Sequence, residues 1–294
     1  MKTRQYLACG VASGSDRLLL KAVSGISGAM TGPVAMARVV HVAHRFPLPV
    51  SPHRDPSAYL LSPTTLLTRH SDQFRHLRAQ AQRRLGHRGM ALVVSPRHGE
   101  GRSIAALSLS LAFAQKGARV IYVEADFRRP ALHTFFDIPA GAGVADLLAG
   151  RQPMSELSAC LLATDAPGLR LLPAGVRSHP PVASAASDAS DASDTPNALD
   201  SPNALDSPRL PELLARLRAE GDWIIVDSPP MLSYNDATPL LGLVDGVVIV
   251  SLEGRTGADD LAELSARLAR ARARVVGAVA LDFLARNSGL LSND

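Results

Sequence analysis

The sequence predicts an α/β fold built on a doubly wound, mostly parallel sheet. From about residue 90 onward, short runs rich in Val, Ile and Leu alternate with segments of helical periodicity. Such continuous apolar runs are typical of parallel strands that helices bury on both faces. A Gly-rich turn follows the first run directly, and two later runs end in carboxylates. Open α/β sheets bind ligands at the carboxyl ends of their strands, so we expect a site at that edge.

The N-terminal part of the chain differs in character from the rest. Residues 1 to about 60 show no sustained period of 3.6 or 2, which predicts a loosely ordered arm over residues 1–65. The α/β domain is expected over residues 66–294, and an amphipathic helix at 72–85 leads into it. In this helix Phe74, Leu77, Ala81 and Leu85 lie near one face.

The remaining elements follow in order along the domain. After the apolar run that begins at Met90, strands are expected at 119–124, 169–173, 223–227, 246–251 and 275–281. Helices are expected at 104–115, 210–220, 237–243 and 259–272. Residues 183–208 interrupt the alternation with SDASDASD and two copies of NALDSP. This segment is acidic and has few apolar residues, which predicts a disordered surface insert.

The turn after the first apolar run has the pattern of a phosphate-binding loop, which we define as residues 96–103. In the usual form, G-x-x-x-x-G-K-[ST], backbone N–H groups cradle the phosphates, the Lys reaches them and the hydroxyl binds Mg²⁺. Here Pro96 takes the first Gly position and Arg102 the Lys position, which leaves the catalytic strength of the loop open. The residues expected to bind phosphates are Arg97, His98, Gly99, Glu100, Gly101, Arg102, Ser103 and Ile104.

Carboxylates at two strand ends complete the predicted site. Glu124 and Asp126 close one apolar run, and Asp227 closes another. Asp227 has the position of a Walker B carboxylate, although a lone Asp after a strand also suits a turn or a helix N-cap. Together with the Ser103 hydroxyl, Asp126 and Asp227 are expected to hold Mg²⁺.

The composition of the chain argues against several other classes of function. The net charge of +4 is spread over several Arg-rich stretches, which we interpret as solvated helix faces rather than a nucleic-acid interface. Arg128 and Arg129 form either a solvated pair or a contact to phosphates or a neighbouring subunit. Cys9 and Cys160 have no metal-ligand or redox spacing. The apolar stretch at 22–40 contains several Gly, a Pro and an Arg, so no membrane span is expected.

The combined motifs resemble the bacterial tyrosine kinase family, and more narrowly the cytosolic chain-length-determinant kinases of exopolysaccharide biosynthesis. The strings that carry the resemblance are SPRHGEGRS, EADFRRP, LPAG and VDSPP, over about residues 70–284. The resemblance implies a P-loop kinase-like domain with ATP and Mg²⁺ as cofactors. It also implies a catalytic set made of Arg102, Glu124, Asp126 and Asp227, with Glu124 or Asp126 accepting the tyrosine proton.

The resemblance further implies partners. Asp72, Arg75 and Arg78 fall on an E-x-x-R-x-x-R motif that the family uses for subunit contact, so a homo-oligomer is expected. Because no membrane span is expected, a separate inner-membrane chain-length regulator, a co-polymerase, is expected to recruit this cytoplasmic chain. No nucleic-acid partner is expected.

Two departures from the family keep other functions open. The chain ends in FLARNSGLLSND, without the usual tyrosine cluster, so Tyr6 and Tyr59 become the candidate phosphoacceptors. Leu281-Asp282 stands where the family tends to have Leu-Asn near the adenine. The first hypothesis is an ATP-dependent tyrosine kinase. The alternatives are a MinD- or ParA-like ATPase switch, in which Arg97 takes the place of a second loop Lys, and a scaffold that has lost nucleotide binding.

Overall fold

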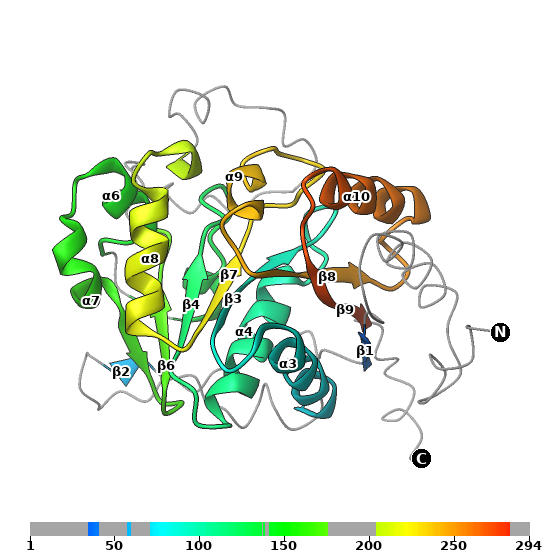
Figure 1. Cartoon of the computed structure of the whole chain (residues 1–294), viewed down its shortest axis with the longest axis horizontal. Helices are drawn as coiled ribbons and strands as arrows, with labels where there is room; N and C mark the ends of the chain where they lie inside the picture. Colours follow the sequence, from blue (N-terminus) through cyan, green and yellow to red (C-terminus); the bar gives the residue numbers. More distant parts are fainter. Residues whose placement is uncertain are drawn as a thin grey trace, which may run out of the picture.

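A single nine-stranded sheet forms the centre of the described part of the chain (Figure 1). The computed structural model describes residues 71–136, 138, 141–175 and 204–282, together with the backbone of two strands at 35–40 and 58–59. The strand order is β1-β9-β8-β3-β7-β4-β6-β5-β2, and β5–β6 is the antiparallel pair in an otherwise parallel sheet. The strands are β1 Ala35–Val40, β2 Ala58–Tyr59, β3 Gly89–Val94, β4 Val120–Glu124, β5 Leu162–Thr164, β6 Leu169–Leu172, β7 Trp223–Asp227, β8 Gly246–Leu252 and β9 Val275–Asp282.

Helices cover both faces of this sheet (Figure 1). One face is covered by α3 (Ser71–Leu85), α4 (Arg102–Ala114) and the short α5 (Leu132–Phe135). The other face is covered by α6 (Val144–Ala149), α7 (Leu157–Cys160), α8 (Leu210–Glu220), α9 (Thr238–Leu241) and α10 (Ala258–Arg270). Two short 3₁₀ helices, Met154–Glu156 and Ala204–Asp206, lie on this second side. None of the helices in the described residues combines the length and apolar character that a bilayer span requires.

The central strand β7 shows how the sequence builds both cores. Its side chains alternate, so that Trp223 and Ile225 join the cluster under α3 and α4 while Ile224 and Val226 join the cluster under α8. Trp223 is fully buried and stacks on Phe113 of α4 with ring centroids 4.0 Å apart. A strand buried on both faces needs the continuous apolar run that this segment has.

The predicted α/β fold is confirmed, and several elements match closely. The helix at 210–220 and the strand at 223–227 have the expected bounds. Three parts differ from expectation. Residues 35–40 and 58–59 of the expected arm form the two edge strands. Residues 204–208 of the expected insert are ordered, because Leu205 is buried in the core and the Ser207 hydroxyl donates to the Leu148 carbonyl. The short helices α5, α6 and α7 were not predicted.

Candidate phosphate-binding site

The phosphate loop connects β3 to α4 at the carboxyl edge of the sheet. Gly99 and Gly101 have φ angles of 72° and 79°, the left-handed region in which glycine is favoured. The backbone N–H groups of residues 98–103 donate to no other described residue. They lie at the N-terminus of a 13-residue helix, where the helix dipole adds positive potential. An unpaired row of N–H groups at this position is suited to an anion such as phosphate.

Two side chains of the loop hold it in shape rather than point to a ligand. The buried Glu100 carboxylate accepts from the Arg97 N–H at 2.7 Å and from the Thr256 hydroxyl at 2.6 Å. The Arg97 guanidinium donates twice to Asp260 of α10, at 2.8 Å each. The loop is therefore fastened to the turn after β8 and to the start of α10.

The Arg102 side chain points to the ends of neighbouring strands and is 7% exposed. Its guanidinium donates to Asp227 at 2.9 Å, to Asp126 at 2.7 Å and to the Ser95 hydroxyl at 3.2 Å. The structure therefore brings the predicted residues Arg102, Asp126 and Asp227 together, but in an ion-paired cluster. In this arrangement three of the five N–H groups of Arg102 donate to the aspartates and to Ser95, and the role of Arg102 as the phosphate-binding cation stays a prediction.

The two aspartates of this cluster have no oxygen without a donor. The second oxygen of Asp227 accepts from the Tyr122 hydroxyl at 2.9 Å, and burial raises the pKa of that phenol well above its usual value. The second oxygen of Asp126 accepts from the backbone N–H groups of Arg128 and Arg129. Among the described residues there is also no group of three or more His, Cys, Asp or Glu suited to a metal ion. Arg102 thus occupies one oxygen of each of the predicted Mg²⁺ ligands Asp126 and Asp227, and the Mg²⁺ site stays a prediction.

Glu124 lies apart from this cluster although it is two residues from Asp126. Its carboxylate is fully buried and accepts from the backbone N–H groups of Ala131, Leu132 and Ala174. Burial raises its pKa to about 7, although these three N–H donors act in the opposite direction. Glu124 thus joins the start of α5 to the segment after β6. This position does not support the predicted role of Glu124 as acceptor of the tyrosine proton.

Beside the phosphate loop, the side chains of His98, Tyr234 and Arg128 pack against one another. The Tyr234 ring meets the His98 ring edge to face at 5.4 Å, and the Arg128 guanidinium lies over the Tyr234 ring at 4.1 Å. Arg128 also pairs with Asp236, so it is neither a solvated residue nor an unpaired phosphate ligand. Burial, together with the charges of nearby arginines, lowers the pKa of His98 to about 4.

The remaining predicted residues lie away from the loop or outside the described part. Tyr6 and the side chain of Asp72 lie outside it, and Tyr59 is in the edge strand β2, with β5 and β6 between it and β4. Arg75 is exposed on α3, whereas Arg78 is half-buried and donates to the Ala112 carbonyl of α4 at 3.4 Å. The predicted subunit contact stays a prediction.

Sequence reasoning missed three residues near the loop. Tyr122 lies within an expected strand, and the contact of its hydroxyl to Asp227 was not foreseen. Tyr234 and Arg255 were not singled out, because both come from turns far along the chain from the loop. Only the order of the strands, with β7 and β8 on either side of β3, indicates that those turns lie beside it.

No known family profile matches the chain. Over 211 residues it is 28% identical to the tyrosine-protein kinase YwqD of Bacillus subtilis, which covers 71% of this chain and 79% of that protein. It is 27% identical to EpsB of Ralstonia nicotianae over 71% of this chain, but spans only 25% of that protein's length.

Solved structures share the fold. The kinase domain of the Escherichia coli tyrosine kinase ETK matches 97% of this chain and 100% of that domain, with a TM-score of 0.67 at 20% identity. The kinase domain of VpsO matches 72% of this chain and 96% of that one, with a TM-score of 0.55 at 26% identity. The chain is therefore similar in sequence to bacterial tyrosine kinases, and it shares the fold of their kinase domains.

Proposed function

We propose that this chain binds ATP at the phosphate loop and acts as a protein-tyrosine kinase that regulates exopolysaccharide chain length or export. The observation that carries the proposal is the row of unpaired N–H groups at residues 98–103, beside Asp126 and Asp227 at the ends of β4 and β7. The similarity to YwqD over most of both chains supports phosphoryl transfer to tyrosine.

The chain's own residues would contribute positioning and charge. Phosphoryl transfer depends mainly on holding the transferred group in line and on neutralising its charge. In this proposal the loop N–H groups hold the phosphates. Asp126 or Glu124 accepts the proton of the tyrosine hydroxyl, and either carboxylate gives up a present donor to do so, because Asp126 is paired with Arg102 and Glu124 with backbone N–H groups.

One observation favours a second candidate function. Arg102 is held by two buried carboxylates, so the cation that usually reaches the terminal phosphates is engaged elsewhere. A chain in this state can bind a nucleotide through its backbone without transferring phosphate. It would then be an ATP-dependent switch that regulates a membrane polysaccharide co-polymerase.

The proposal includes two kinds of partner for this chain, a membrane regulator and further copies of the chain itself. We expect a cytoplasmic chain that a separate inner-membrane chain-length regulator recruits, and a homo-oligomer formed through Asp72, Arg75 and Arg78. The resemblance of these residues to the subunit-contact motif of the family is the support for the oligomer. Transfer between subunits would then bring Tyr6 or Tyr59 of one copy to the loop of another.

Phosphotyrosine mapping tests the proposal. The purified full chain is incubated with Mg·ATP and the cytoplasmic segment of the regulator, and phosphotyrosine is located by mass spectrometry. Asp126→Asn and Asp227→Asn serve as variants. Phosphate on Tyr6 or Tyr59 that both variants lack supports the kinase. ATP binding without phosphotyrosine supports the switch, and a chain that binds no ATP contradicts both.

A further inference from the structure

The turn between β8 and α10 places an arginine directly against the phosphate loop. A Cβ built on Gly99 would come within 2.9 Å of one Arg255 guanidinium nitrogen and 3.1 Å of the other. The guanidinium therefore lies over the loop at a position that only glycine leaves open. The Arg255 side chain is exposed and has no hydrogen bond or ion pair with any residue in the described ranges.

Two contacts hold this turn on the loop, and both come from residues that follow Arg255 in the chain. Thr256, the next residue, receives the Leu252 N–H at 2.8 Å and donates its hydroxyl to Glu100. Asp260 accepts both donors of Arg97. Arg255 is thus held in place from Thr256 and from α10, while its guanidinium has no acceptor among the described residues.

The other arginines around the loop have acceptors of their own, with one exception. Arg102 is bound to Asp126 and Asp227, Arg97 to Asp260, and Arg128 to Asp236. The exception is Arg129, which is exposed and close enough for its charge to lower the pKa of His98. No contact of the Arg129 side chain places it on the loop, whereas the guanidinium of Arg255 packs on Gly99.

We propose that Arg255, rather than Arg102, is the side chain that binds the terminal phosphates of the nucleotide. The inference rests on the proposed nucleotide binding at the loop and names the cation of that site. A guanidinium donates to phosphate in a bidentate, charge-assisted manner, and its charge would add to that of the loop N–H groups. Arg102 then serves as the internal counter-ion of the two aspartates and keeps that role when the nucleotide binds.

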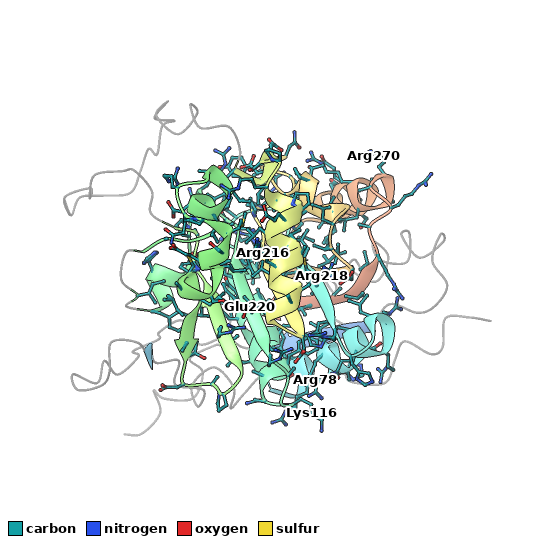
Figure 2. The ribbon with its side chains drawn as sticks, turned by 60° about the vertical axis from the view of Figure 1, so that its left-hand side comes forward. Arg78, Lys116, Arg216, Arg218, Glu220 and Arg270 are labelled. Atoms are coloured by element: carbon teal, nitrogen blue, oxygen red, sulfur yellow. The ribbon has the colours of Figure 1, made fainter. Side chains whose placement is uncertain are left out.

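Nucleotide titration by calorimetry on the full chain tests this division of roles. The variants are Arg255→Ala, Arg255→Lys and Arg129→Ala, with Arg270→Ala as the matched control, an exposed arginine in the last turn of α10 (Figure 2). We expect Arg255→Ala to weaken ATP about 10- to 100-fold, the range for a lost charge-assisted contact, and to weaken AMP far less. Arg255→Lys should recover part of the ATP affinity, and Arg270→Ala should match the wild type.

The outcomes separate this inference from the function on which it rests. ATP binding by the wild type with equal affinity in Arg255→Ala overturns the inference and leaves nucleotide binding intact. A loss in Arg129→Ala in place of Arg255→Ala also overturns it. A wild-type chain that binds no nucleotide overturns the proposed function and this inference together. Because Arg255 is exposed, unchanged urea midpoints are expected to show that the variants fold.

Discussion

At the scale of single residues, the cluster around Arg102 determines the electrostatics of the site. One guanidinium faces two carboxylates within 2.9 Å, and all of these groups are less than 10% exposed. Removing one partner of a buried ion pair leaves an uncompensated charge, which is far more costly than losing an exposed pair. The cluster and a divalent ion therefore compete for the same oxygens.

Substitution of Arg102 tests this competition. We expect Arg102→Ala to lower the free energy of unfolding by about 3–5 kcal/mol at pH 7, because Asp126 and Asp227 lose their counter-ion. Mg²⁺ should restore part of that loss in the variant and leave the wild type unchanged. Urea unfolding with and without Mg²⁺ measures both effects. Arg97→Ala, which removes an exposed pair to Asp260, is the control and should cost at most about 1 kcal/mol. Equal stabilisation of the wild type by Mg²⁺ would contradict the competition.

The buried carboxyl of Glu124 predicts a pH effect on stability. Its pKa is raised from 4.5 to about 7 in the folded chain, so between these values the folded state binds more protons than the unfolded state. The free energy of unfolding should therefore fall as the pH rises from about 5 to 8, by up to about 3 kcal/mol from this group. His98 acts with the opposite sign, since its pKa is lowered to about 4.

A comparison of the wild type with Glu124→Gln isolates the contribution of this carboxyl. His98 is present in both chains, so its effect cancels in the difference. We expect the difference in unfolding free energy between pH 5 and pH 8 to be less negative in the variant by about 3 kcal/mol. Parallel pH profiles for the two chains would show that Glu124 is ionised throughout this range.

At the scale of elements, the second copy of the NALDSP repeat contributes a side chain to the core. In the second copy Leu205 lies in the core within the 3₁₀ helix Ala204–Asp206, which precedes α8. Leu205→Ala should lower the free energy of unfolding by about 2–5 kcal/mol, the usual cost of such a cavity. Leu199 is the equivalent residue of the first copy; it lies outside the described residues, in the segment that the sequence predicts to be a disordered insert. Leu199→Ala is the matched control and should change stability by less than about 0.5 kcal/mol in urea unfolding. Equal losses would contradict the distinction.

How far the sequence predicts each element depends on how local its signal is. The bounds of the β7 strand and the α8 helix were predicted correctly, because an unbroken apolar run and a periodic helical segment carry their own information. The helices α5 to α7 have only four to six residues each, too short for a period to show. Leu205 was missed because a polar, repetitive context hides a single buried side chain.

The residues of the candidate site, like the elements, were predicted only where their sequence signal is local. The loop, Asp126 and Asp227 follow from motifs at strand ends, and the parallel sheet brings them together. The direction in which Arg102 points does not follow from its place in the motif, since it depends on which acceptors lie within reach. Arg255 and Thr256 contact the loop because β8 lies beside β3, a tertiary fact without a local signature.

At the scale of the whole molecule, self-association is the property that the proposed function needs. Arg75 is exposed on α3. Arg78 of the same motif, which is labelled in Figure 2, is half-buried and donates to α4. We expect Arg75→Glu to shift the chain toward the monomer in sedimentation velocity and to leave ATP affinity within about twofold, because α3 does not contribute to the loop. Arg270→Glu on α10 carries the same charge change and should not alter the oligomer. An unchanged distribution in Arg75→Glu would rule out this face as the subunit contact.

The stacked pair of Trp223 and Phe113 has a practical consequence for every one of these measurements. Trp223 is the single tryptophan of the chain and is fully buried at the start of the strand that ends in Asp227. Its fluorescence should be emitted from an apolar environment in the folded state and move to longer wavelength when water reaches the indole. The chain thus carries one intrinsic optical reporter at the centre of its sheet, and unfolding of this domain can be followed without any attached label.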